Sequence, residues 1–191
     1  MIKSIEETPA GCDQDHVPGI VTSLPQMPSR IDAITAGGPT PLPALRDALR
    51  RLECAGADLI AMPCNTAHFW YEDLCRATRL PFLHIVDSAL ASLGEGRRRI
   101  GVLASSATIR AGIYSSRLRA SGRQVIEPGV EQQSLSVDAA IAAVKAGRIA
   151  DAAALLAPVA LRLVDAGADA VVLGCTEFPI AMAGQRWESV M

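Results

Sequence analysis

Apolar residues along the chain follow two patterns, one typical of amphipathic helices and one of buried strands. From residue 41 to residue 54, leucines recur at intervals of three and four, which predicts a helix with one buried face. Short continuous apolar runs at 81–86 and 99–105 are bounded by polar or turn residues, as buried strands are. The other predicted helices are 66–78, 87–94, 108–120, 136–146 and 149–166, and the other strands are 16–23 and 124–127. Because strands and helices alternate, we expect an α/β fold with mainly parallel sheets flanked by helices.

One apolar segment occurs twice with the same flanking residues. Ala-Gly-Ala-Asp stands at 55–58 and again at 166–169, and each copy runs through a short apolar stretch to a cysteine, Cys64 or Cys175, so that the two copies are 111 positions apart. The glycine of each copy is placed to end a helix, and the apolar stretch then reads as a strand. Each cysteine is therefore expected just past the carboxyl end of a buried strand.

The repeat predicts two pseudo-symmetric half-domains, residues 1–96 and 97–191, with the active site in the cleft between them. A counterpart of strand 99–105 would fall before residue 1, and counterparts of strand 81–86 and helix 87–94 would fall beyond residue 191. Relative to its own internal symmetry, the chain is therefore expected to be short at both ends.

Composition narrows the class of protein further. The formal net charge is −2 and hydrophobic residues make up 50% of the chain, so neither nucleic acid nor an anionic membrane is an expected partner. The longest apolar stretch, 152–161, is interrupted by Pro158 and is too short to cross a bilayer. The first residues have no signal-peptide core. We expect a soluble, cytoplasmic protein.

The cysteines are the candidate reactive residues of the chain. The five cysteines form no Cys-x-x-Cys pair and their number is odd, so neither a disulfide framework nor a metal site is expected. Cys12, Cys54 and Cys75 lie outside the repeat and are interpreted as small buried apolar residues. Cys64 and Cys175 are expected near helix N-termini, where the helix dipole favours the thiolate.

The residues next to the two repeated cysteines suit a small anion. The Asn65 amide and the hydroxyls of Thr66 and Thr176 can hold a carboxylate. A thiol on each side of one carbon can invert a stereocentre, because one thiolate removes the Cα proton and the opposite thiol supplies another. No cofactor is expected: the chain has no Gly-rich phosphate loop and no lysine beside either motif that could anchor pyridoxal phosphate.

Two segments resemble the signature motifs of the cofactor-independent aspartate/glutamate racemase superfamily, closest to its aspartate racemase branch. These are Met62-Pro63-Cys64-Asn65-Thr66-Ala67-His68 and Leu173-Gly174-Cys175-Thr176-Glu177-Phe178-Pro179. The resemblance implies that Cys64 and Cys175 are the acid/base pair, that Glu177 lies near the substrate ammonium group, and that the protein is a homodimer acting on a small-molecule amino acid.

Two further positions follow from the same resemblance. The segment Pro25 to Arg30 is similar to the family's Pro-x-Ile-Pro-Asp-Arg, which implies that Arg30 contacts a substrate carboxylate. Lys145 matches the lysine of the family's Lys-x-Gly segment. Without the resemblance, both cations would be interpreted as ordinary solvated charges. The family usually also has a first apolar strand that ends in a Gly-Gly-Met-Gly-Pro-like loop, and a closing strand and helix. These correspond to the elements whose counterparts, by the internal repeat, would fall before residue 1 or beyond residue 191.

Several functions remain open at this point. The leading hypothesis is a racemase, independent of pyridoxal phosphate, that acts on aspartate or a related acidic amino acid. The alternatives are another two-cysteine member of the superfamily, such as a hydantoin racemase or a maleate isomerase, or a truncated module that binds without turnover. His68, four residues after Cys64, is interpreted as support for the thiolate or the fold rather than as a metal ligand, because further ligands at metal-like spacing are missing.

Overall fold

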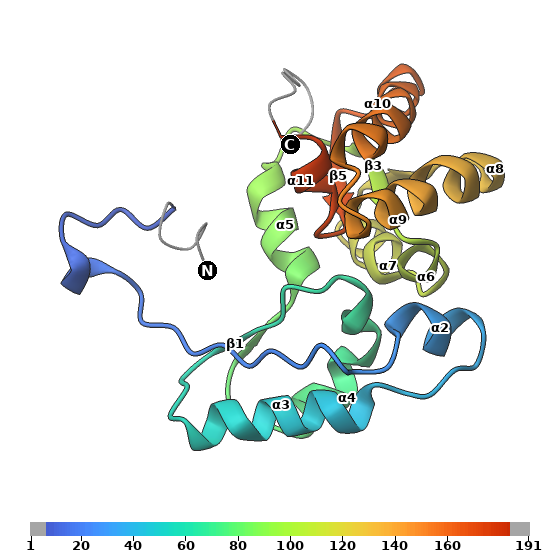
Figure 1. The fold of residues 1–191 in the computed structure, drawn as a ribbon. Helices are drawn as coiled ribbons and strands as arrows, with labels where there is room; N and C mark the ends of the chain where they lie inside the picture. Colours follow the sequence, from blue (N-terminus) through green and yellow to red (C-terminus); the bar gives the residue numbers. More distant parts are fainter. Residues whose placement is uncertain (1–6, 184–191) are drawn as a thin grey trace.

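The computed structural model describes residues 7–183 and has two parts, each built on a parallel sheet (Figure 1). In the first part, β1 (Ile60–Ala61) pairs with β2 (Phe82–Leu83). In the second, β3 (Arg99–Ala104) lies between β4 (Gln124–Ile126) and β5 (Ala170–Gly174), giving the order β4-β3-β5. The predicted α/β class with parallel sheets is therefore confirmed. None of the helices within residues 7–183 has the length and apolar character needed to cross a membrane.

Helices connect and cover these strands. In the first part they are η1 (Asp13–Asp15), α2 (Arg30–Thr35), α3 (Leu42–Cys54), η2 (Thr66–Trp70), α4 (Tyr71–Cys75) and α5 (Ile85–Leu93). In the second they are α6 (Ser106–Arg110), α7 (Ile113–Ala120), α8 (Val130–Gln132), the π-helical turn η3 (Gln133–Asp138), α9 (Ala139–Lys145), α10 (Ile149–Asp165) and α11 (Phe178–Ala181). The predicted helices at 41–54 and 149–166 are confirmed to within a residue at each end.

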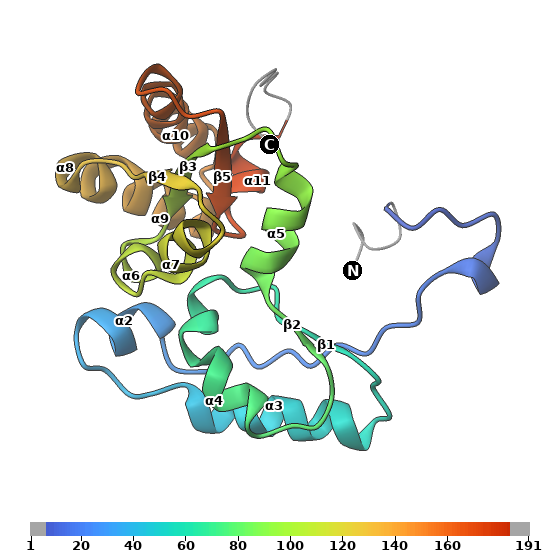
Figure 2. The ribbon, with the colours of Figure 1, turned by 180° about the vertical axis from the view of Figure 1, so that it is seen from behind.

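The second sheet is buried on both faces. Helices α9, α10 and α11 cover one face, where Leu156 and Phe178 are fully buried. Helices α5 and α7 cover the other, through Val86 and Leu118. Helix α5, the last element of the predicted first half, thus packs in the core of the second sheet and runs between the two parts (Figures 1 and 2).

The repeated Ala-Gly-Ala-Asp segment folds alike in both copies. Gly56 and Gly167 follow α3 and α10 with φ of 82° and 90°, a left-handed conformation that suits glycine at the end of a helix. In the second copy, the Asp169 carboxylate accepts hydrogen bonds from the backbone N–H groups of Arg98 and Arg99 at 2.8 and 2.7 Å. This contact joins the beginnings of β3 and β5, and the chain then leaves β5 directly into Cys175.

The structure differs from the expected elements at several places. The expected strand 81–86 is only β2, and the expected helix 66–78 is the 3₁₀ helix η2 followed by α4, which ends at Cys75. Residues 16–23 are not a strand: no segment within residues 7–183 pairs with them, and without a hydrogen-bonding neighbour Val17 and Val21 stay 70% and 69% exposed. The expected helix 108–120 is two helices, α6 and α7, because the backbone turns at Gly112 with φ of 66°. Helix α5 begins at Ile85 rather than at Asp87.

Two of the cysteines outside the repeat also differ from expectation. Cys12 and Cys54 are exposed, and Cys75 is half-buried. Cys54 ends α3 and Cys12 precedes η1, so both lie at helix ends at the surface rather than in a core. The prediction that they are small buried apolar residues was wrong for these two.

Candidate active site

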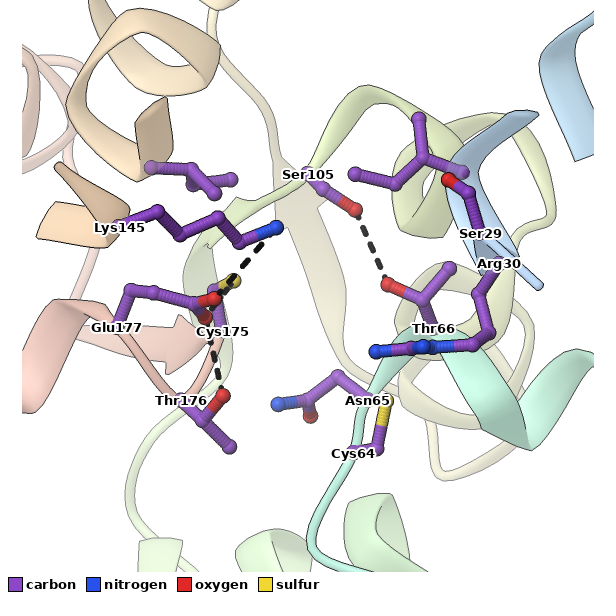
Figure 3. A pocket seen from close by; sticks show the side chains of 12 residues that line it. Ser29, Arg30, Cys64, Asn65, Thr66, Ser105, Lys145, Cys175, Thr176 and Glu177 are labelled. Carbon is purple, nitrogen blue, oxygen red and sulfur yellow. Dashed lines mark hydrogen bonds and ion pairs between the residues drawn. The ribbon is translucent and has the colours of Figure 1, made fainter. Parts of the chain in front are cut away.

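A pocket of about 220 Å³ opens between the two parts of the molecule, and every residue predicted for the site lines it (Figure 3). These residues are Arg30, Cys64, Asn65, Thr66, Lys145, Cys175, Thr176 and Glu177. Ser29, Ile31, Ser105 and Ile141 complete the lining. Cys64 enters from the loop after β1 and Cys175 from the end of β5, on different sides of the pocket. The carboxyl ends of parallel strands thus bring the two repeated motifs together, as ligand sites in such sheets are built.

The loop that carries Cys64 is held by His68. The Nδ1 of His68 lies 2.9 Å from the backbone oxygen of Cys64, and its Nε2 accepts the backbone N–H of Ile85 at 3.1 Å. The acceptor role of Nε2 puts the ring proton on Nδ1, which donates to Cys64. Burial also lowers the pKa of His68 below its usual value, so the ring is neutral. With both nitrogens engaged, His68 is a structural support for the loop and not a free metal ligand.

The thiol of Cys175 is held in its protonated form. Burial raises the pKa of Cys175, and the hydrogen bond to Glu177 and that residue's negative charge raise it further. The Sγ of Cys175 donates to Oε2 of Glu177 at 3.0 Å. The expectation that a helix dipole favours the thiolate was wrong here, because α11 is only four residues long and a carboxylate faces the sulfur directly.

Glu177 joins Cys175 to the cation on its side of the pocket. Its Oε2 also accepts the Thr176 hydroxyl at 3.0 Å, and its Oε1 lies 3.9 Å from Nζ of Lys145. Partial burial alone would raise the pKa of Glu177, but the hydrogen bonds from Cys175 and Thr176, together with Lys145, outweigh it and lower the pKa. The carboxylate is therefore ionised.

The hydroxyl of Thr66 takes part in a buried network between the two parts. It lies 3.2 Å from Oγ of Ser105 and 2.9 Å from Oγ1 of Thr108, and these two are 3.0 Å apart. Sequence reasoning missed Ser105 and Thr108. Ser105 could have been found, because it follows directly on β3 at the same strand edge as the two cysteines.

Arg30 reaches the pocket from the first turn of α2. The hydroxyl of Ser29 caps this helix by accepting the Asp32 N–H at 3.2 Å. The Arg30 guanidinium lies on the same side of the pocket as Cys64 (Figure 3). Lys145, at the end of α9, lies on the opposite side with Cys175. One cation thus accompanies each cysteine, which favours an anionic ligand.

Metal-ligating side chains do not gather anywhere in the described part of the chain. Within residues 7–183, no group of three or more His, Cys, Asp and Glu side chains is placed to hold a metal ion. The polar groups that line the pocket are thiols, hydroxyls, an amide and charged groups of both signs. This set suits a small zwitterion that carries additional negative charge.

Comparison with known proteins gives one family. The profile of the "Asp/Glu/Hydantoin racemase" family matches residues 1–188. Broad specificity amino-acid racemase RacX of Bacillus subtilis (strain 168) is 33% identical over 134 residues, which make up 70% of this chain and 58% of RacX. The chain therefore spans little more than half the length of that relative.

Solved structures give the same fold. An aspartate racemase from Picrophilus torridus superposes with a TM-score of 0.84 and 30% identity, over 99% of this chain and 81% of that one. A glutamate racemase from Francisella tularensis, solved with D-glutamate, superposes with a TM-score of 0.59 and 18% identity, over 84% of this chain and 57% of that one. At 18% identity, the match to the glutamate racemase supports the fold alone.

Proposed function

Because the chain belongs to the Asp/Glu/hydantoin racemase family, we propose that it is an amino-acid racemase that inverts Cα of an acidic amino acid with two cysteines and no cofactor. The observation that carries this proposal is the pocket, where one thiol enters from each of the two repeated motifs on different sides. Two bases on opposite faces of one carbon are what stereochemical inversion by proton transfer requires.

The protonation of Cys175 sets the direction of one turnover. In one direction of turnover, Cys64 is the base that removes the Cα proton, while Cys175, whose thiol donates to Glu177, holds the proton for the opposite face. The electron pair left on Cα delocalises into the substrate carboxylate. Cys175 then donates its proton to the opposite face of Cα, and the enantiomer forms. Cys64 now carries a proton and Cys175 is a thiolate, which is the state that acts on the other enantiomer.

The charges of the pocket match the charges of an acidic amino acid. Arg30 and Lys145 each pair with one of the two carboxylates, as charge-assisted hydrogen bonds favour. The ionised Glu177 pairs with the substrate ammonium group. The Thr176 hydroxyl and the Asn65 amide supply further donors to a carboxylate at the pocket wall. Aspartate is the substrate that we propose. Because RacX is a broad specificity amino-acid racemase, related amino acids should be tested as substrates together with aspartate.

The test is incubation of the purified chain with each enantiomer of aspartate in deuterium oxide. Racemisation predicts that deuterium enters Cα of both enantiomers and that both samples converge to the same mixture, followed by proton NMR and chiral chromatography. Glutamate, alanine, a hydantoin and maleate are tested in parallel. Turnover of the hydantoin or of maleate without exchange on any amino acid would favour another two-cysteine chemistry. A chain that exchanges no substrate would contradict the proposed activity.

A further inference from the structure

Tyr114 is a buried side chain that connects the second part of the molecule to the motif of Cys64. It lies in the first turn of α7 and is 4% exposed. Its hydroxyl donates to Oδ1 of Asn65 at 2.5 Å, across 49 positions of sequence. Asn65 directly follows Cys64, lines the pocket and is itself 6% exposed. A buried hydrogen bond thus joins α7 to the residue beside one proposed catalytic thiol.

The ring of Tyr114 also touches the motif of the other cysteine. A Cβ placed on Gly174 would come within 2.9 Å of Cε2 of Tyr114, closer than packed carbon atoms approach. Gly174 is therefore the residue that lets the ring lie against the end of β5, directly before Cys175. One side chain contacts the neighbours of both cysteines, through its hydroxyl on one side and its ring edge on the other.

The hydrogen bond decides which end of the Asn65 amide faces the pocket. Because Oδ1 accepts from Tyr114, the amide NH₂ is the end left for a ligand, and Figure 3 shows it pointing toward the side of Cys175 and Thr176. In the opposite orientation the amide NH₂ would face the Tyr114 hydroxyl, whose proton would lose the acceptor that it has among residues 7–183. Unpaired buried donors are disfavoured. Burial raises the pKa of Tyr114, so the hydroxyl keeps its proton.

We propose that Tyr114 is a positioning residue, which holds the Asn65 amide with its N–H groups directed into the pocket to bind a carboxylate beside Cys64. The identity of this carboxylate as that of an amino-acid substrate rests on the proposed function. The orientation of Asn65 does not, because any small carboxylate that enters the pocket meets the same donor.

The test compares two alkylating reagents at one thiol. Iodoacetate carries a carboxylate and iodoacetamide does not, and both alkylate Cys64, which is followed on its own peptide by mass spectrometry. We measure the ratio of the iodoacetate rate to the iodoacetamide rate in the parental chain, in Tyr114→Phe, in Asn65→Ala and in the double variant. Tyr114→Phe keeps the ring against Gly174 and removes only the hydroxyl. Looser packing that exposes the thiol would change the rates of both reagents alike. The ratio of the two rates would then stay unchanged.

We expect Tyr114→Phe and Asn65→Ala each to lower the ratio about tenfold, the value of one hydrogen bond to a charged group. The double variant should lower it no further, because Tyr114 acts through Asn65. Tyr71→Phe is the matched control: its hydroxyl donates to the backbone oxygen of Phe82 at 2.7 Å, outside the pocket, and its removal should leave the ratio unchanged.

The proposal would be overturned if Tyr114→Phe or Asn65→Ala kept the rate ratio of the parental chain. It would also be overturned if the ratio in the double variant fell by the product of the two single losses. Alkylation needs no turnover. If the parental chain fails to racemise any amino acid, the proposed function fails while the rate ratios still decide the role of Tyr114.

Discussion

Acid should destabilise the protein through His84, the residue that caps α5. The Nδ1 of His84 accepts the backbone N–H of Val86 at 3.1 Å, so this nitrogen must be unprotonated. The ring is 6% exposed and lies edge-on to His68, with centroids 4.6 Å apart. Burial is the main cause that lowers the pKa of His84 from 6.5 to about 4, and the positive charge of Arg117 lowers it further.

The sign and size of the effect follow from this difference in pKa. As the pH falls below 6.5, the unfolded chain takes up a proton on His84, whereas the folded chain does not until about pH 4. The stabilisation is therefore complete above pH 6.5, is lost between 6.5 and about 4, and changes no further below that. At about 1.4 kcal/mol per pH unit, the loss is at most about 3.5 kcal/mol, a large part of the roughly 5–15 kcal/mol that stabilises a typical domain.

Denaturant unfolding across this pH range measures the loss, and His84→Asn is the matched control. Asparagine is a strongly preferred N-cap and does not titrate. The free energy of unfolding of the parental chain should therefore fall more steeply than that of the variant between pH 6.5 and 4. Carboxylates titrate in both proteins, so their contribution cancels in the comparison. Parallel curves for the two proteins would refute the role given to His84.

Three predictions concern the site. Cys64→Ser and Cys175→Ser should each reduce racemisation of aspartate to background in a chiral assay, because a hydroxyl is a far poorer base than a thiolate near neutral pH; a parental rate in either would refute the assignment. Arg30→Ala and Lys145→Ala should raise KM for aspartate by about tenfold or more and change that for alanine less, since each removes a charge-assisted contact; equal losses for both amino acids would mean that these residues support the fold. Glu177→Gln should speed alkylation of Cys175 by iodoacetamide, because the carboxylate that disfavours its thiolate is gone. Alkylation of Cys64 in the same sample is the control, and an unchanged rate at Cys175 would contradict the role of Glu177.

The sequence predicted the parts of the fold that depend on local pattern. The leucine spacing of α3, the glycines that end α3 and α10, and the position of each repeated cysteine after a strand are all found in the structure. The same strand-end rule brought the two cysteine motifs to one pocket, whereas Arg30 on α2 and Lys145 on α9 were predicted from the family resemblance. Local pattern suffices for these features because neighbouring residues determine them.

Features that depend on distant partners were not predictable in this way. Residues 16–23 have the apolar pattern of a strand, but a strand also needs a neighbour for its backbone hydrogen bonds. The protonated state of Cys175 depends on burial and on the direction in which the Glu177 side chain turns. Tyr114 gives no sequence signal, because its contact with Asn65 joins segments that only the assembled fold brings together.

The most direct test of the central claim, two cysteines on opposite faces of one carbon, uses the two serine variants with a substrate that needs only one base. A β-chloro derivative of aspartate loses chloride once its Cα proton is removed, so a single thiolate suffices. Chloride release is measured for each enantiomer with Cys64→Ser and with Cys175→Ser. We predict mirror-image selectivity: each variant eliminates from one enantiomer, and the two variants choose opposite ones. Elimination from the same enantiomer by both variants would contradict the two-base arrangement.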